Sequence, residues 1–199
     1  MRVRNESSDG FTLIELLVVI AIIAVLLRLV FPVFQGVQDR AKKVQAKNDL
    51  TQIVTAVNAF YTEYGRYPVD STITTDAGAT FGAGSTSSQA LFDTLRGKST
   101  TLNTRQIVFI SPPEDSTQPT PKGKIGSDGQ FHDPWGTAYV VRMDANYDNN
   151  VDNAYTDGSA GGDSSNSYAL RIGVIAWSLG KDGSKAPSFK NSDDVISWQ

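Results

Sequence analysis

The sequence predicts an α+β fold in which one long N-terminal helix packs against a small antiparallel sheet. An apolar run fills residues 11–34, and an amphipathic pattern continues the helical period as far as Tyr64. The remaining chain has only short apolar runs, separated by loops rich in Gly, Ser, Thr, Asp and Asn. One helix followed by short strands is typical of an α+β domain, so we expect a single head on a helical stem.

Composition excludes several classes of function. The net charge of −3 and the lack of a Lys/Arg stripe argue against a nucleic-acid partner. The 199 residues include no Cys and one His, His132, which leaves no thiol nucleophile and no His-based catalytic set. No Gly-rich phosphate loop follows a strand. We therefore do not expect an enzyme, and we expect packing, hydrogen bonds or a metal ion to hold the loops in place of disulfides.

The N-terminal segment has three features of its own. Residues 1–10 form a short polar leader with two arginines, which favours a cytoplasmic location for the leader. Residues 11–34 are long and apolar enough to span a bilayer, although Glu15 lies among them at a cost of at least ~2.5 kcal/mol. No cleavage site of small residues follows Phe34, so we expect this segment to be retained and any cleavage to precede it.

The stretch Gly-Phe-Thr-Leu-Ile-Glu at residues 10–15 resembles the signature of type IV pilins and type II secretion pseudopilins. The resemblance implies that a prepilin peptidase cleaves after Gly10 and methylates the new N-terminus at Phe11. It also implies that Glu15 pairs with the N-terminal amine of a neighbouring subunit in a filament. A carboxylate in an apolar environment needs such a cationic partner. The alternative is a plain membrane anchor with an isolated Glu.

Arg28 near the end of the apolar segment is explained either by snorkelling to periplasmic headgroups or by an ion pair with a neighbouring subunit. Residues 35–65 then read as the amphipathic half of the helix, ended by Gly65. The predicted apolar stripe toward the head consists of Val44, Leu50, Ile53, Val54, Val57, Phe60, Tyr61 and Tyr64.

Residues 66–199 form the predicted head. We expect a loop over residues 70–88 and a short helix over residues 89–97. Strands are expected at residues 107–110, 138–142, 168–172 and 174–178. The Tyr-Gly-x-Tyr-Pro run that ends the long helix and the Asp-Pro-Trp-Gly turn at residues 133–136 resemble the head of the major pseudopilin.

Residues 144–152 carry oxygen-bearing side chains at every second position, as at the start of a Ca²⁺ loop of the EF-hand type. That pattern requires Gly at its sixth position and Glu at its twelfth, where this chain has Asn149 and Tyr155. Two interpretations remain open: a solvated turn between strands, or a second, weak ion site.

The C-terminal turns carry the main candidate metal site. Ser-Leu-Gly-Lys-Asp-Gly at residues 178–183 and the Asp pair followed by Trp198 are similar to the Ca²⁺ loop of major pseudopilins. The resemblance implies that a structural Ca²⁺ ion is held by the Leu179 carbonyl and the carboxylates of Asp182, Asp193 and Asp194. Carboxylates and carbonyls are the oxygen ligands that this ion prefers. The alternative is a pair of tight turns that bind no metal.

The resemblance implies a structural subunit of a type II secretion pseudopilus. Such a subunit lies in the bacterial inner membrane with its head in the periplasm, and it polymerises with copies of itself. Its other expected partners are the prepilin peptidase, minor pseudopilins and an inner-membrane assembly platform. The alternative is a type IV pilus subunit for adhesion, motility or DNA uptake. A third class, a membrane-anchored binding or enzymatic domain, would retain an active head without the helix.

Overall fold

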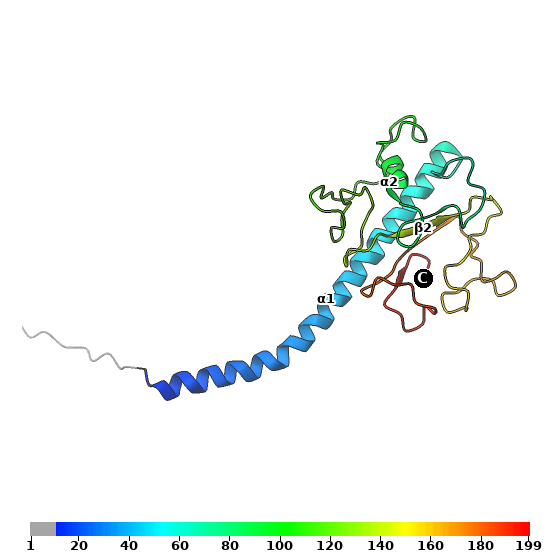
Figure 1. Ribbon diagram of the computed structural model, residues 1–199. Helices are drawn as coiled ribbons and strands as arrows, with labels where there is room; N and C mark the ends of the chain where they lie inside the picture. Colours follow the sequence, from blue (N-terminus) through cyan, green and yellow to red (C-terminus); the bar gives the residue numbers. More distant parts are fainter. Residues whose placement is uncertain (1–10) are drawn as a thin grey trace, which may run out of the picture. The chain divides into compact units, whose positions relative to one another are not determined.

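A computed structural model describes residues 11–199 of the protein, apart from the side chains of residues 29–35. The secondary-structure elements are, in chain order, α1 (Leu13–Tyr64), β1 (Thr80–Phe81), α2 (Gln89–Leu95), β2 (Val140–Met143), β3 (Val174–Ser178) and β4 (Val195–Ile196) (Figure 1). The chain divides into two compact units, Met1–Ala41 and Lys42–Gln199. The predicted α+β class is confirmed.

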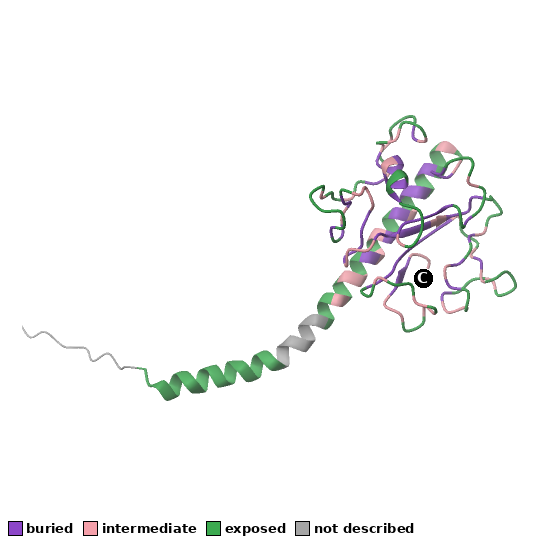
Figure 2. Ribbon diagram, in the orientation of Figure 1, coloured by how far each residue is buried: buried purple, intermediate pink, exposed green. Residues whose placement is uncertain are grey.

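The first unit consists of the N-terminal part of α1. Every side chain from residue 11 to residue 28 is exposed (Figure 2), because no other element packs against this part of the helix. Within the residues that the structure describes, no helix meets the combined length and hydropathy requirements of a membrane span.

In the second unit, α1 packs through one stripe of apolar side chains. Ala46, Leu50, Ile53, Val57 and Phe60 are at most slightly exposed, and their spacing of three or four residues places them on one face. The predicted stripe is wrong at two positions: Val44 is 70% exposed and Tyr61 is 39% exposed. Val44 precedes Ala46 by two residues, which places it on the opposite side of the helix.

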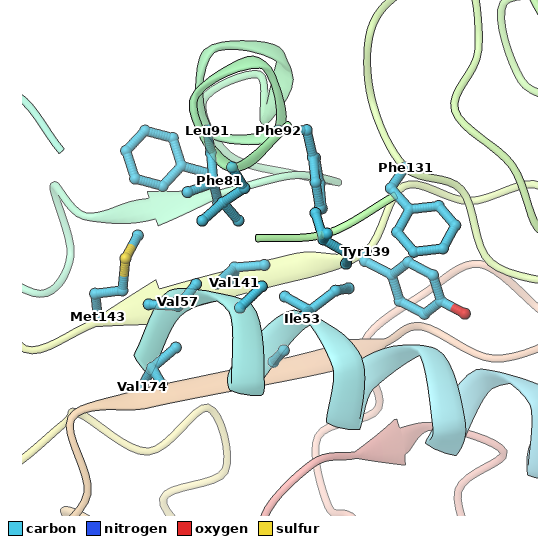
Figure 3. Close-up of a cluster of buried hydrophobic side chains, with 14 of the residues drawn as sticks. Ile53, Val57, Phe81, Leu91, Phe92, Phe131, Tyr139, Val141, Met143 and Val174 are labelled. Atoms are coloured by element: carbon cyan, nitrogen blue, oxygen red, sulfur yellow. The ribbon is translucent and has the colours of Figure 1, made fainter. Parts of the chain in front are cut away.

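Four antiparallel strands form one sheet in the order β1-β2-β3-β4. All five residues of β3 are buried because both faces of this strand are covered. Val174 and Ala176 belong to the core beneath α1, whereas Ile175 and Trp177 belong to a second apolar cluster that includes Tyr155. Figure 3 shows the first core, in which α1 lies over β2 and β3 and α2 contributes further side chains.

Three predicted elements of the head are wrong. Residues 107–110 are not a strand, because the Asn103 side chain bonds both backbone groups of Ile107 and the Leu95 carbonyl accepts from the amides of residues 109 and 110. Residues 168–172 make only isolated bridges. The predicted loop 70–88 contains β1, whose two residues are too few to give an alternating pattern.

Candidate functional sites

The start of α1 is closed by a reciprocal hydrogen-bond pair between Thr12 and Glu15. The Glu15 carboxylate accepts from the Thr12 backbone N–H at 2.8 Å and from its hydroxyl at 2.6 Å. The Glu15 N–H in turn donates to the Thr12 hydroxyl oxygen at 3.3 Å. This is a capping box, and it supplies partners for helix N–H groups that would otherwise lack them. Thr12 is thus a site residue that the sequence analysis missed, although Thr-x-x-Glu is the sequence signal of this motif.

Phe11 lies just before the cap and is 78% exposed, so the predicted methylation position is accessible. Gly10, the predicted cleavage position, lies outside the described residues. The Glu15 carboxylate is within one helical turn of the predicted new N-terminus. The capping box therefore holds this carboxylate at the end of the helix, where the predicted pairing with an amine requires it.

Beyond this cap, the described side chains of α1 up to residue 28 form an exposed apolar surface. Leu13, Ile14, Leu17 and Val25 are each at least 61% exposed, and large apolar side chains continue around the whole helix. A soluble monomer rarely exposes an apolar surface of more than a few hundred Å². This part of α1 therefore requires an apolar surrounding that a single copy does not provide.

In the head, the Asp-Pro-Trp-Gly turn is built around the buried carboxylate of Asp133. One oxygen accepts backbone N–H donors from Trp135, Gly136 and Thr137 at 2.8–2.9 Å. The other accepts from the Ser178 hydroxyl at 2.6 Å. Burial raises the pKa of Asp133, and these hydrogen bonds oppose the rise. Two motifs separated in the sequence, residues 133–136 and 178–183, are thus joined by one hydrogen bond.

Asp194 is the most deeply buried of the predicted metal ligands, at 4% exposure. One of its oxygens accepts from the Tyr155 hydroxyl at 2.6 Å and from the Ala186 N–H at 3.1 Å. Its other oxygen is buried without a hydrogen-bond partner. A buried carboxylate oxygen without a partner is costly, and a cation is the kind of ligand that would satisfy it. In this respect the site fits a hard metal ion.

The other predicted ligands lie in the turns of the same loop. One oxygen of the Asp193 carboxylate accepts from the backbone N–H groups of Lys181 (2.5 Å) and Asp182 (3.1 Å). These two bonds do not involve its second oxygen. Asp182 accepts from the Ser184 N–H at 2.9 Å, and Leu179 is largely buried. Among the described residues, no three acidic, His or Cys side chains are close enough together to form a metal-binding group. The Ca²⁺ site therefore stays a prediction.

Two residues outside the loop hold its ends, and sequence reasoning missed both. Tyr155 fixes Asp194, and the phenol lies in the second apolar cluster. Lys47 of α1 donates to the carbonyls of Ile196 and Ser197 at 2.8 and 3.4 Å. Neither residue type signals such a role in the sequence, because the contacts join positions more than 38 residues apart.

In the second candidate loop, residues 144–152, one carboxylate accepts hydrogen bonds from the backbone of the same loop. The buried Asp144 carboxylate accepts the N–H groups of Asp148 and Asn149 at 3.1 and 2.9 Å. Asn149 adopts a left-handed conformation (φ 65°), as the glycine of an EF-hand loop would. These bonds satisfy both oxygens of the Asp144 carboxylate from the loop's own N–H groups and do not by themselves require an ion. A second ion at this loop stays a prediction.

His132 has a structural explanation. It is buried, and its two ring nitrogens lie 3.1 Å from the Gly136 carbonyl and 3.1–3.2 Å from the Asp128 carboxylate. The imidazole therefore links the chain on either side of the Asp133 turn.

Comparison with known proteins defines the N-terminal region. The family model described as the prokaryotic N-terminal methylation motif matches residues 7–27. The type IV major pilin protein PilA of Myxococcus xanthus is 43% identical over 63 residues, which are 32% of this chain and 29% of PilA. The type II secretion system core protein G of Klebsiella michiganensis is 35% identical over 65 residues, which are 33% of this chain and 46% of that protein.

Core protein G of Escherichia coli is 39% identical over 64 residues, which are 32% of this chain and 44% of that protein. The chain spans less than half the length of each of these curated relatives. No solved structure matches the chain.

These matches show which proteins the N-terminal third of the chain resembles. The chain is prepilin-like: it carries the N-terminal methylation motif, and its N-terminal third is homologous to type IV pilins and to type II secretion core protein G. The relatives named here are a pilin and secretion-system core proteins, and none of them is named as an enzyme. The resemblance of residues 10–15 to this class is thus confirmed.

Proposed function

We propose that this protein is the fibre-forming subunit of a type II secretion pseudopilus. The observation that supports this most directly is the hydrogen bond from Ser178 to Asp133. It joins the two head motifs, residues 133–136 and 178–183, that resemble the major pseudopilin. A shared N-terminal helix alone would not favour a pseudopilin over a pilin.

In this proposal the exposed apolar part of α1 is first held in the bacterial inner membrane, with the head in the periplasm. Prepilin peptidase cleaves after Gly10 and methylates Phe11, and an assembly platform with minor pseudopilins draws the subunit into a fibre. Stacked helices then bury the apolar side chains that one copy leaves exposed. Glu15 pairs with the amine of a neighbouring copy, and the growing fibre moves exported proteins across the outer membrane.

A type IV pilus subunit is the second candidate, favoured by the 43% identity to PilA over 63 residues. Deletion of the gene in the native bacterium separates the two. Exported proteins that accumulate in the periplasm, with surface filaments unchanged, are the result expected for a secretion subunit. Loss of surface filaments with export intact would contradict it. Complementation with the wild-type chain should restore export, whereas Glu15→Val should not, because the apolar variant lacks the pairing carboxylate.

We further propose that the C-terminal loop holds one Ca²⁺ ion through Asp194, with Asp182, Asp193 and the Leu179 carbonyl as the other ligands. The support is the buried Asp194 oxygen that lacks a hydrogen-bond partner. The ion would supply charge compensation there and would tie the loop to the sheet in a head without disulfides.

Calcium titration of the full-length protein in detergent tests this proposal. A ligand that binds only the folded state stabilises it by about 2.7 kcal/mol at 100 times its Kd, so the melting temperature should rise with Ca²⁺. Asp194→Asn should abolish the rise. Asp148→Asn, in the other candidate loop, is the matched control and should leave it unchanged. A melting temperature insensitive to Ca²⁺, or an equal rise in the Asp194 variant, would contradict the site.

A further inference from the structure

We propose that Tyr155 is a positioning residue for the C-terminal ion site, and that ion binding and the docking of its segment, residues 151–160, stabilise each other. This role rests on the Ca²⁺ site proposed above, to which it adds a residue from outside the C-terminal loop, residues 179–194. A residue of this kind contacts a metal ligand and not the metal itself.

Residues 151–160 are anchored on the sheet. Val151, Tyr155 and Ala160 are each fully buried, and they pack with side chains of β3 in the second apolar cluster. Two backbone hydrogen bonds with Leu170, at 2.8 and 2.9 Å, also hold Val151. The position of the Tyr155 ring is therefore decided mainly by the sheet.

From this anchored position, the Tyr155 hydroxyl donates to Oδ2 of Asp194 at 2.6 Å. The Ala186 N–H donates to the same oxygen at 3.1 Å. Because a carboxylate is planar, donors on Oδ2 restrict the direction of Oδ1, which is buried and has no hydrogen-bond partner. Oδ1 is the atom whose charge the proposed ion would compensate. Tyr155 therefore orients this ligand before the ion binds.

Further contacts join the segment to the C-terminal loop and to Trp198 beyond it. Three hydrogen bonds make these connections: Lys185 Nζ to the Ala154 carbonyl (2.9 Å), the Phe189 N–H to the Ser159 hydroxyl (2.8 Å) and the Trp198 indole N–H to the Ala160 carbonyl (2.9 Å). The Lys185 ammonium also lies 4.5 Å from the centre of the Tyr155 ring. A displacement of the loop would therefore break contacts along the segment and not only at Asp194.

Coupling between the ion and the segment follows from these contacts. An ion that binds Asp194 only in its oriented position stabilises every contact that holds Asp194 there. Such coupling is reciprocal, so a change that weakens the docking of residues 151–160 also lowers the affinity for the ion.

Calorimetric titration of the full-length protein in detergent with Ca²⁺ measures this effect. Tyr155→Phe keeps the buried ring and removes only the hydroxyl. It should raise the Kd for Ca²⁺ about tenfold, the lower end of the effect of losing an outer partner of a metal ligand.

Tyr139→Phe is the matched control. Tyr139 is also a fully buried phenol that donates to a carboxylate, that of Asp49 at 2.8 Å, but it lies in the first core. Loss of its hydroxyl removes a bond of the same kind away from the C-terminal loop. The Kd for Ca²⁺ should therefore stay unchanged in this variant.

Hydrogen exchange gives an independent readout. Ca²⁺ should slow the exchange of the backbone amides of residues 151–160 in the wild type, because the ion stabilises their docking. The slowing should be much smaller in Tyr155→Phe. Protected amides in α2, Gln89–Leu95, show that the variant remains folded.

Equal Kd values for the wild type and Tyr155→Phe would overturn the positioning role and leave the ion site in place. An equal loss of affinity in Tyr139→Phe would also overturn it, since the effect would then be general to the head. A wild type that binds no Ca²⁺ would instead contradict the ion site itself, and the role of Tyr155 with it.

Discussion

At the scale of single residues, carboxylates decide much of how the head is held together. Asp49 of α1 accepts a hydrogen bond from the Tyr139 hydroxyl at 2.8 Å and so connects the helix to the chain leading into β2. Burial raises the pKa of Asp49, the bond from Tyr139 opposes the rise, and the charge of Asp133 adds to it. Burial also raises the pKa of Tyr139 far above its usual range, so the phenol remains a donor at physiological pH.

The raised pKa of Asp49 predicts a pH dependence with a definite sign. Between the unfolded value of 3.8 and the raised folded value, the folded state binds more protons than the unfolded state. The free energy of unfolding therefore rises as the pH falls through this window. Asp49→Asn keeps an oxygen for Tyr139 but does not titrate, so the wild type should gain stability relative to this variant on acidification.

Thermal unfolding of the two full-length proteins at a series of pH values measures this difference. Asp70→Asn is the control of opposite sign, because hydrogen bonds from Thr72 lower the pKa of Asp70. A group with a lowered pKa contributes stability above 3.8 that is lost as the pH falls through the folded value. A constant gap between the wild type and Asp49→Asn would show that Asp49 does not titrate as its burial requires.

At the scale of the elements, the sequence predicted best where a long pattern exists. The end of α1 at Tyr64, the helix from Gln89 and the bounds of β3 agree with the structure. Gly65 adopts the left-handed conformation (φ 67°) that ends the helix, as predicted. The two-residue strands β1 and β4 gave no readable pattern, because their pairing is decided by contacts with distant strands.

At the candidate sites too, the sequence predicted local motifs but not the contacts between distant residues. The class of the chain and the Asp133 turn could be read from short motifs, since each motif determines its own local geometry. Lys47 and Tyr155, which hold the C-terminal loop from outside, could not be read. Their roles depend on tertiary packing and not on neighbouring residues in the sequence.

The corrected face of α1 predicts which substitutions destabilise the head. Ile53→Ala removes a fully buried side chain from the core in Figure 3 and should lower the free energy of unfolding by about 2–5 kcal/mol. Val44→Ala changes an exposed position and should alter it by less than about 0.5 kcal/mol. Chemical unfolding of both full-length variants measures the two values. Equal losses would contradict the assignment of the two faces.

At the scale of the whole molecule, the chain combines a packed head with a helix that one copy leaves uncovered. The head has its own cores on both faces of the sheet. The first part of α1 exposes apolar side chains around its whole circumference. A fibre of stacked helices would cover this surface, and the capped Glu15 would lie at the end of each helix, beside the processed N-terminus of a neighbour.

The N-terminal sequence and intact mass of the subunit in fibres from the native bacterium test this account most directly. A chain that begins at Phe11 and is heavier by one methyl group is the predicted result, because the proposed assembly places the processed amine beside Glu15. A fibre built from chains that still begin at Met1 would contradict the account. The apolar segment would then be an ordinary anchor, and Glu15 would have no role in assembly.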